Sequence, residues 1–173
     1  DNSYHPAEGI FELGIPILGI CYGCQLLAHH LGGLVTAAEQ ENAREYGKTR
    51  TFYDTSCLLF DGLPQEGISW MSHGDFMKRV PDGFQLAAYS GKCPNVAICD
   101  EKRKFYGVQF HPEVNHTENG TAMIRNFLYK VCGAVGDWTM EGYLQRCIGE
   151  IRSRVGKEKG LLALSGGVDS SVC

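Results

Sequence analysis

Gly14-Ile15-Pro16-Ile17-Leu18-Gly19-Ile20-Cys21-Tyr22-Gly23 carries an apolar run directly into a cysteine flanked by glycines. The run from Ile15 to Ile20 is short, continuous and bounded by turn residues, which predicts a buried strand of a parallel sheet. Apolar and aromatic positions then recur at helical spacing, at Leu26, Leu27, His30 and Leu31. Gly32-Gly33 marks the end of this helix. The pattern therefore predicts a strand that turns sharply into a helix, as in α/β folds.

The turn itself has the G-x-nucleophile-x-G pattern, with Cys21 in the place of the usual serine. A nucleophile on a strained strand-to-helix turn needs small neighbours, which Gly19 and Gly23 provide. The N-terminus of the helix supplies a positive potential that favours a thiolate. We therefore predict that Cys21 is a nucleophile and that the N–H of Tyr22 is an oxyanion donor.

A cysteine nucleophile needs a base, and His111 is the best placed of the six histidines because it follows the strand-like run Phe105 to Phe110. Residues two apart in an extended segment face the same way, so Glu113 is expected beside His111. In that position Glu113 would fix the tautomer of the imidazole and stabilise the imidazolium, as the third member of a triad does.

Other interpretations of these residues remain open. Cys21 and Cys24 have the spacing of a redox dithiol, and a cysteine can also be a small buried hydrophobic residue. A zinc site needs a second ligand pair, and none with suitable spacing is clear, since the adjacent His29 and His30 point in different directions from a helix. No metal site is therefore predicted. His73 fits a hydrogen-bonded loop residue as well as a catalytic one.

Further runs predict short strands separated by Gly, Pro, Asp and Asn turns. They are Leu34 to Ala38, Arg44 to Tyr53, Cys57 to Phe60, Ile68 to Met71, Phe84 to Tyr89, Val96 to Cys99 and Phe105 to Phe110. A second helix is predicted from about Glu118 to Cys132, with Thr117 as its N-cap. Residues 1–132 are thus expected to form one α/β domain, a sheet flanked by helices.

A glycine-rich linker is predicted at residues 133–138, before a second domain that begins at residue 139 and continues to residue 173. An amphipathic helix with Leu144, Ile148, Ile151 and Val155 on one face leads to a short apolar strand. The turn Ser165-Gly166-Gly167-Val168-Asp169-Ser170-Ser171 follows. Glycines let backbone N–H groups converge on an anion, and the serines add hydroxyl donors. This turn predicts a phosphate site, with the rest of its domain expected beyond Cys173.

The composition is that of a globular protein, with 43% hydrophobic and 21% charged residues and a formal net charge of −4. Basic residues form no dense run, so nucleic acid is not an expected partner. No apolar run approaches the roughly 18 residues that a membrane span needs. The eight cysteines are scattered through apolar stretches, which favours reduced thiols in the cytoplasm over a disulfide framework.

Two motifs together, Gly14 to Gln25 and Gly107-Val108-Gln109-Phe110-His111-Pro112-Glu113-Val114, resemble those of the class I, or triad, glutamine amidotransferases. The resemblance implies that Cys21, His111 and Glu113 hydrolyse glutamine to glutamate and ammonia. It also implies that glutamine is bound by Gln25, Ser72, His73 and Gly74. The last three of these residues would act mainly through main-chain groups. In the family, further strands and a glycine-rich oxyanion loop come earlier, so we expect them before Asp1.

The turn from Ser165 to Ser171 resembles the PP-loop of ATP pyrophosphatases, and it lacks the Gly-Lys-Ser/Thr ending of a Walker A loop. An amidotransferase joined to such a domain implies a ligase that uses ATP, Mg2+ and the released ammonia to aminate xanthosine monophosphate. It also implies that the complete enzyme is a homodimer. Two alternatives are the amidotransferase of another synthase and a non-catalytic binding module of the same fold. The strand before the turn argues against the first, and the complete triad argues against the second.

Overall fold

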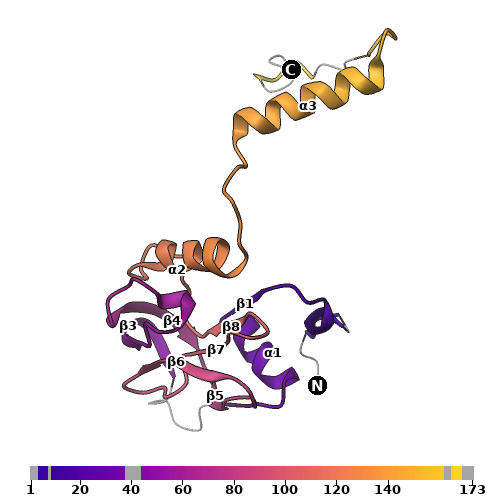
Figure 1. The fold of residues 1–173 in the computed structure, drawn as a ribbon. Helices are drawn as coiled ribbons and strands as arrows, with labels where there is room; N and C mark the ends of the chain where they lie inside the picture. Colours follow the sequence, from indigo (N-terminus) through magenta and orange to yellow (C-terminus); the bar gives the residue numbers. More distant parts are fainter. Residues whose placement is uncertain (1–3, 8, 38–43, 162–164, 169–173) are drawn as a thin grey trace. The chain divides into compact units, whose positions relative to one another are not determined.

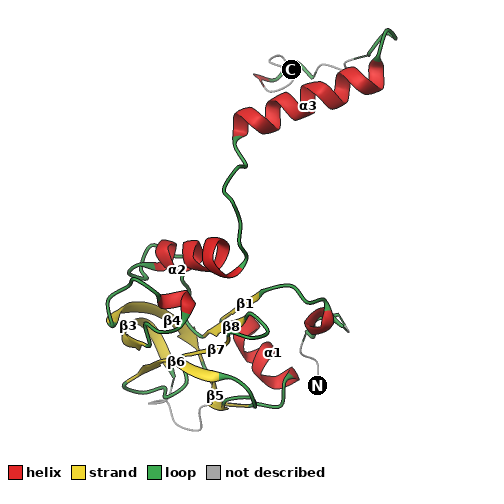
Figure 2. Ribbon diagram, in the orientation of Figure 1, coloured by secondary structure: helices red, strands yellow, loops and turns green. Residues whose placement is uncertain are grey.

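The structure is a computed structural model, and its two compact units cover residues 1–135 and 136–173. It describes residues 4–7, 9–37, 44–161 and 165–168 (Figure 1). The first unit is a mixed α/β structure whose strands and flanking helices are distinguished in Figure 2. No helix in the described ranges is both long enough and apolar enough to cross a membrane.

A six-stranded sheet forms the centre of the first unit, in the order β1-β8-β7-β6-β3-β4. Its strands in this order are β1 (Ile17–Ile20), β8 (Phe105–Val108), β7 (Ala97–Asp100), β6 (Gln85–Ser90), β3 (Glu45–Tyr53) and β4 (Glu66–His73). β1 and β8 pair in parallel, and every other neighbouring pair is antiparallel. The predicted parallel strand before Cys21 is therefore confirmed.

The remaining elements flank this sheet or follow it. A two-stranded antiparallel ribbon joins β2 (Leu34–Ala37) to β5 (Asp75–Arg79). The helical elements of the first unit are the 3-10 helices η1 (Ile10–Glu12) and η3 (Leu58–Phe60), the α-helices α1 (Tyr22–His30) and α2 (Gly120–Asn126), and the π-helix η4 (Phe127–Val131). The second unit contains α3 (Met140–Val155), which begins after its N-cap Thr139.

The two faces of the sheet carry different cores, because successive side chains of a strand point to opposite faces. Ile98 of β7 belongs to a small cluster on the α1 face, together with Cys24 and Met77. Its neighbour Cys99 belongs to a larger cluster that includes Met123 of α2. The sheet therefore lies between α1 on one face and the α2 and η3 helices on the other.

Two glycines allow α1 to approach the sheet closely. Gly19 of β1 and Gly107 of β8 are partners in the parallel pairing. A Cβ on Gly19 would lie 2.6 Å from the carbonyl oxygen of Gly23, and a Cβ on Gly107 would lie 2.7 Å from Cys24 Sγ. Since atoms cannot approach so closely, the first turn of α1 requires glycine at both positions of the sheet.

One strand prediction is wrong, and one strand was not predicted. The run Cys57 to Phe60 contains a 3-10 helix rather than a strand, and the N–H of Phe60 donates to the carbonyl of Cys57 at 2.9 Å. Periodicity does not separate a short apolar run of a strand from a buried helical turn. The strand β5 was not predicted, and it begins directly after the segment Ser72 to Gly74 that was interpreted as a loop.

The start of the second helix also differs from the prediction. α2 begins at Gly120, and Thr117 does not cap it. Instead, the Thr117 hydroxyl donates to the carbonyl of His111 at 2.5 Å and accepts a hydrogen bond from the N–H of Trp70 at 3.0 Å. The hydroxyl therefore joins β4 to the segment that carries His111. In the second unit, the predicted amphipathic helix is confirmed as α3, whereas residues 162–164 of the predicted final strand lie outside the described residues.

Substitutions of Gly19 and Gly23, which lie two residues before and after Cys21, are expected to have different effects on stability. Gly19→Ala should lower the free energy of unfolding by about 1–3 kcal/mol, because the added methyl group overpacks the contact with α1. Gly23→Ala should be neutral or slightly stabilising, because a Cβ there meets no atom within 4 Å and the residue is helical. Urea unfolding of the intact protein that carries this chain measures both effects. Equal losses in the two variants would contradict the proposed close contact.

Candidate active site

Cys21 lies on a strained turn between β1 and α1. Its φ of 51° and ψ of −107° place it in a region that residues other than glycine rarely adopt. Its N–H donates to the carbonyl of Val108 at 2.8 Å, and its own carbonyl accepts from the N–H groups of Cys24 at 3.0 Å and Gln25 at 3.2 Å. These bonds hold the turn from both sides, so the thiol is fixed at the carboxyl end of the parallel strand pair.

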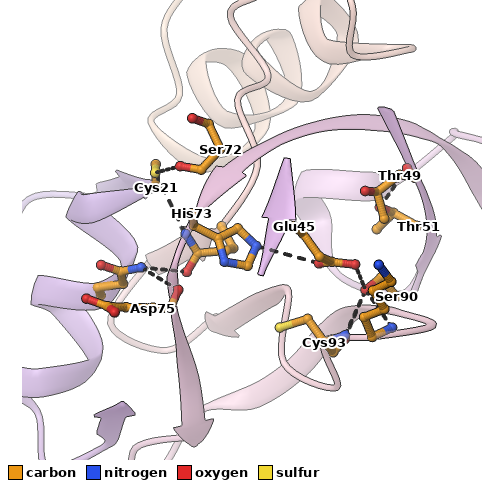
Figure 3. A network of polar contacts seen from close by, with 12 residues as sticks. Cys21, Glu45, Thr49, Thr51, Ser72, His73, Asp75, Ser90 and Cys93 are labelled. Carbon is orange, nitrogen blue, oxygen red and sulfur yellow. Dashed lines mark hydrogen bonds and ion pairs between the residues drawn. The ribbon is translucent and has the colours of Figure 1, made fainter. Parts of the chain in front are cut away.

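The Cys21 thiol is half-buried and has two polar neighbours. Sγ lies 3.7 Å from the carbonyl oxygen of Ser72 (Figure 3) and 3.7 Å from Nε2 of Gln109. Burial raises the pKa of the Cys21 thiol, and the negative charge of Glu113 raises it further, while the N–H of Tyr22 and the amide of Gln109 act in the opposite direction. The N–H of Tyr22, in the first turn of α1, favours the thiolate, but burial outweighs this effect.

His111 and Glu113 lie side by side, with Nδ1 of His111 2.7 Å from Oε1 of Glu113. A neutral imidazole that donates through Nδ1 keeps Nε2 free to accept a proton. The main chain holds His111 in place, because its N–H donates to the carbonyl of Trp70 at 3.0 Å. The structure therefore brings together the acid and base groups that the sequence singled out. Among the described residues, Cys21 Sγ makes its hydrogen bonds to Ser72 and Gln109 and none to His111.

Gln109 is a polar residue of the site that the sequence analysis did not select. Its side chain is fully buried, and it connects Cys21 to Gln25, whose Nε2 donates to Oε1 of Gln109 at 3.1 Å. Gln25 Nε2 also donates to the carbonyl of Asp75 at 3.0 Å. The signal was present, because Gln109 precedes His111 by two residues and so shares its side of an extended segment.

The residues Ser72, His73 and Gly74 lie where β4 ends and β5 begins, not in a long loop. Ser72 presents its carbonyl to Cys21, whereas the side chain of His73 points to Glu45 (Figure 3). Nε2 of His73 lies 3.5 Å from Oε2 of Glu45, and the two side chains are 2% and 3% exposed. Only the main chain of His73 can therefore contribute to the surface near Cys21.

The glycine-rich turn in the second unit is described only in part. Ser165, Gly166, Gly167 and Val168 are described, and Gly166 has a φ of 80°, in the region that glycine readily adopts. Asp169, Ser170 and Ser171 lie outside the described residues. Their predicted part in phosphate binding therefore stays a prediction.

The Cys21-x-x-Cys24 spacing does not produce an exposed pair of thiols. Cys24 is fully buried on the side of α1 that packs against the sheet, and burial strongly raises the pKa of its thiol. A redox dithiol needs an accessible thiol with a lowered pKa. The environment of Cys24 instead suits a small residue that packs against Gly107.

A cysteine on the strand-to-helix turn after β1 and a histidine–glutamate pair after the adjacent parallel strand β8 form an order that is typical of cysteine-dependent hydrolytic sites. The family model described as "Glutamine amidotransferase class-I" matches residues 1–131. The chain belongs to this family.

Curated relatives of this chain are named GMP synthase [glutamine-hydrolyzing]. The relative from Geobacillus kaustophilus is 55% identical over 163 residues, which are 94% of this chain and 31% of that protein. The relative from Streptococcus thermophilus is 53% identical over 172 residues, or 99% of this chain and 33% of that protein. The chain thus spans about a third of the length of these relatives.

Solved structures support the same fold. A protein from Thermoplasma acidophilum, described as a putative GMP synthase subunit, is 37% identical, with a TM-score of 0.66 over 82% of this chain and 64% of that chain. A glutamine amidotransferase from Thermotoga maritima is 29% identical, with a TM-score of 0.56 over 71% of this chain and 50% of that chain. The sheet flanked by helices that the sequence predicts for the first domain is therefore confirmed.

The charge of Glu113 leads to a prediction about the acidity of Cys21. Glu113→Gln should move the pH profile of Cys21 alkylation to lower pH, because it removes a negative charge that raises the pKa of the thiol. Iodoacetamide labelling at several pH values, followed by mass spectrometry of the Cys21 peptide, measures this profile. Glu66→Gln is the matched control, since Glu66 pairs with Arg50 on β3. An unmoved profile, or a shift to higher pH, would contradict the assigned effect of Glu113.

The buried pair of His73 and Glu45 predicts a large loss of stability when one partner is removed. His73→Ala should lower the free energy of unfolding by about 1–3 kcal/mol, because it leaves Oε2 of Glu45 buried without its polar neighbour at 3.5 Å. Glu66→Ala, which breaks the exposed pair with Arg50 between the same two strands, should cost at most about 1 kcal/mol. Chemical denaturation measures both variants, and similar losses would show that burial of the first pair has no special effect.

Proposed function

We propose that the first unit hydrolyses the side-chain amide of glutamine, with Cys21 as nucleophile, His111 as general base and then acid, and Glu113 as the group that orients His111. The observation that carries this proposal is the parallel pairing of β1 and β8. Because Cys21 follows β1 and His111 follows β8 by a few residues, the pairing brings nucleophile and base to one edge of the sheet.

The first half of the reaction forms a covalent intermediate. The Cys21 proton passes to Nε2 of His111 as Sγ attacks the amide carbon of glutamine, and the carbonyl oxygen becomes an oxyanion that the N–H of Tyr22 stabilises. His111 then gives this proton to the departing nitrogen, the carbon–nitrogen bond breaks, and ammonia leaves. The product of this half is a glutamyl thioester on Cys21.

Water completes the cycle. His111 removes a proton from water, whose oxygen attacks the thioester carbon, and the proton then returns to the sulfur as glutamate leaves. Glu113 keeps Nδ1 of His111 protonated throughout, so Nε2 alone exchanges protons. The carbonyl of Ser72 and the Oε1 atom of Gln25 are acceptors suited to the N–H groups of glutamine, with the main chain of His73 and Gly74 beside them.

For the whole protein we propose the activity of a GMP synthase: ammonia, ATP and xanthosine monophosphate give GMP, AMP and pyrophosphate. Relatives with this name match 99% of the chain, so the similarity continues beyond residue 131, where the amidotransferase model ends. This extension favours the GMP synthase over the amidotransferase of another synthase. Residues 139–173 would begin the ATP pyrophosphatase domain, with Ser165 to Ser171 holding pyrophosphate and Mg2+ accompanying ATP. We further propose a cytoplasmic homodimer.

Substitution of the nucleophile separates the two proposed activities. In the intact protein that carries this chain, Cys21→Ala should reduce glutamine-dependent GMP formation by at least about 1000-fold, because no thioester can form. GMP formation from added ammonia should remain. A coupled assay of both reactions, with Cys132→Ser as a control at an exposed cysteine, measures this difference. Retained glutaminase activity would exclude Cys21 as nucleophile, whereas wild-type protein that makes no GMP from ammonia would exclude the proposed synthase.

A further inference from the structure

A second group of reactive side chains lies outside the candidate active site. Cys57, Cys99 and Glu101 each offer one ligand atom, and these three atoms lie within 4.8 Å of one another. Cys57 directly precedes η3, Cys99 lies on β7, and Glu101 follows the end of β7. The fold therefore brings together residues that are distant in the sequence, and we call them the Cys57 cluster.

The two thiols of the Cys57 cluster face each other in the core. Cys57 is 4% exposed and Cys99 is 2% exposed, and both belong to the large cluster on the sheet face away from α1. Their sulfur atoms lie within 4.8 Å of each other, although the two residues come from different elements of the fold. The two sulfurs are therefore close enough to bind one thiophilic ion together.

The carboxylate of the cluster is held in position by two donors. The N–H of Leu58 donates to Oε1 of Glu101 at 3.0 Å, and the hydroxyl of Tyr106 donates to Oε2. Tyr106 is the partner of Cys99 in the pairing of β7 with β8, so it is fixed by the sheet itself. Groups that hydrogen-bond to metal-binding carboxylates orient them in the same way.

We propose that Cys57, Cys99 and Glu101 bind a thiophilic divalent cation, Zn2+, with water as the fourth ligand. Zn–S bonds of about 2.3 Å and Zn–O bonds of about 2.0–2.2 Å place tetrahedral ligands less than about 4 Å apart, which the 4.8 Å spacing allows with small side-chain movements. Two thiolates and one carboxylate do not suit Mg2+, which prefers oxygen ligands. The site is thus distinct from any Mg2+ that accompanies ATP.

Binding involves no oxidation or reduction. The two thiols release their protons to solvent, and two sulfur–zinc bonds and one oxygen–zinc bond form. Because the thiols must be deprotonated, affinity falls as the pH falls. The ion would connect the segment before η3 to β7 and β8, and it would stabilise the folded unit by mass action.

Cobalt tests the proposal, because tetrahedral Co2+ has visible d–d bands and each bound thiolate adds charge-transfer absorption in the near ultraviolet. The reduced, metal-free intact protein should bind one equivalent of Co2+ with this spectrum, and Zn2+ should abolish it. Cys57→Ser and Cys99→Ser should each lose the spectrum. Glu101→Gln should weaken binding by at least about 10-fold.

Matched variants distinguish this site from other thiols. Cys21→Ala removes the active-site thiol and Cys132→Ser removes an exposed one, and both should keep the full spectrum. Circular dichroism checks that the Cys57→Ser and Cys99→Ser variants are folded, and these two variants, unlike the wild type, should show no rise in thermal midpoint with Zn2+. The proposal is overturned if the spectrum survives in Cys57→Ser or in Cys99→Ser, if it disappears in Cys21→Ala, or if the wild type does not show it. None of these results depends on glutaminase or GMP synthase activity.

Discussion

The close contact between the first turn of α1 and two glycines of the sheet is the constraint on which the candidate active site depends. Gly19 and Gly107 are partners in the pairing of β1 with β8, so the first turn of α1 packs against both strands at the same place. Cys21 follows the first strand and His111 follows the second. Packing therefore brings the proposed nucleophile and the proposed base to the same edge, although Cys21 Sγ makes its hydrogen bonds to Ser72 and Gln109. A β-carbon at either glycine would move the helix and, with it, the thiol.

The charges near Cys21 favour proton transfer within the site over release of the proton to solvent. Burial and Glu113 both raise the pKa of the thiol, so an isolated thiolate beside the carboxylate is unfavourable. Transfer to His111 creates a thiolate and an imidazolium together, which leaves the net charge of the three groups unchanged. In the proposed mechanism Glu113 orients His111, with Oε1 2.7 Å from Nδ1, while its negative charge disfavours the thiolate of Cys21. In the proposed mechanism the thiolate and the imidazolium form together, so the mechanism needs a base that the fold holds in place.

Local patterns in the sequence were sufficient for the parts of the site that local geometry controls. The turn at Cys21 and the neighbouring positions of His111 and Glu113 depend on residues close in the chain, and the structure has all three as expected. The side chain of His73 could not be placed in this way, because its burial depends on the β3–β4 register, which sets it opposite Glu45. Thr117 was misassigned for a similar reason, since tertiary hydrogen bonds replace its expected capping role. The positions of these two side chains therefore depend on contacts between residues distant in the sequence, which local spacing does not reveal.

The same alternation along β8 serves both faces of the sheet. Gly107 faces α1 and leaves room for Cys24, while its neighbour Tyr106 faces the opposite core and donates to Glu101. Three residues beyond Val108, the chain reaches His111. A movement of β8 would thus disturb three features together: the contact of α1 with Gly107, the position of His111, and the Cys57 cluster. The environments of the cysteines differ accordingly: Cys21 is half-buried on the turn after β1, Cys24 is buried against Gly107 of β8, and the strand pairing places Cys99 near the carboxylate of Glu101. The burial and the polar neighbours of each thiol therefore depend on where it lies relative to β8, although all three residues are cysteines.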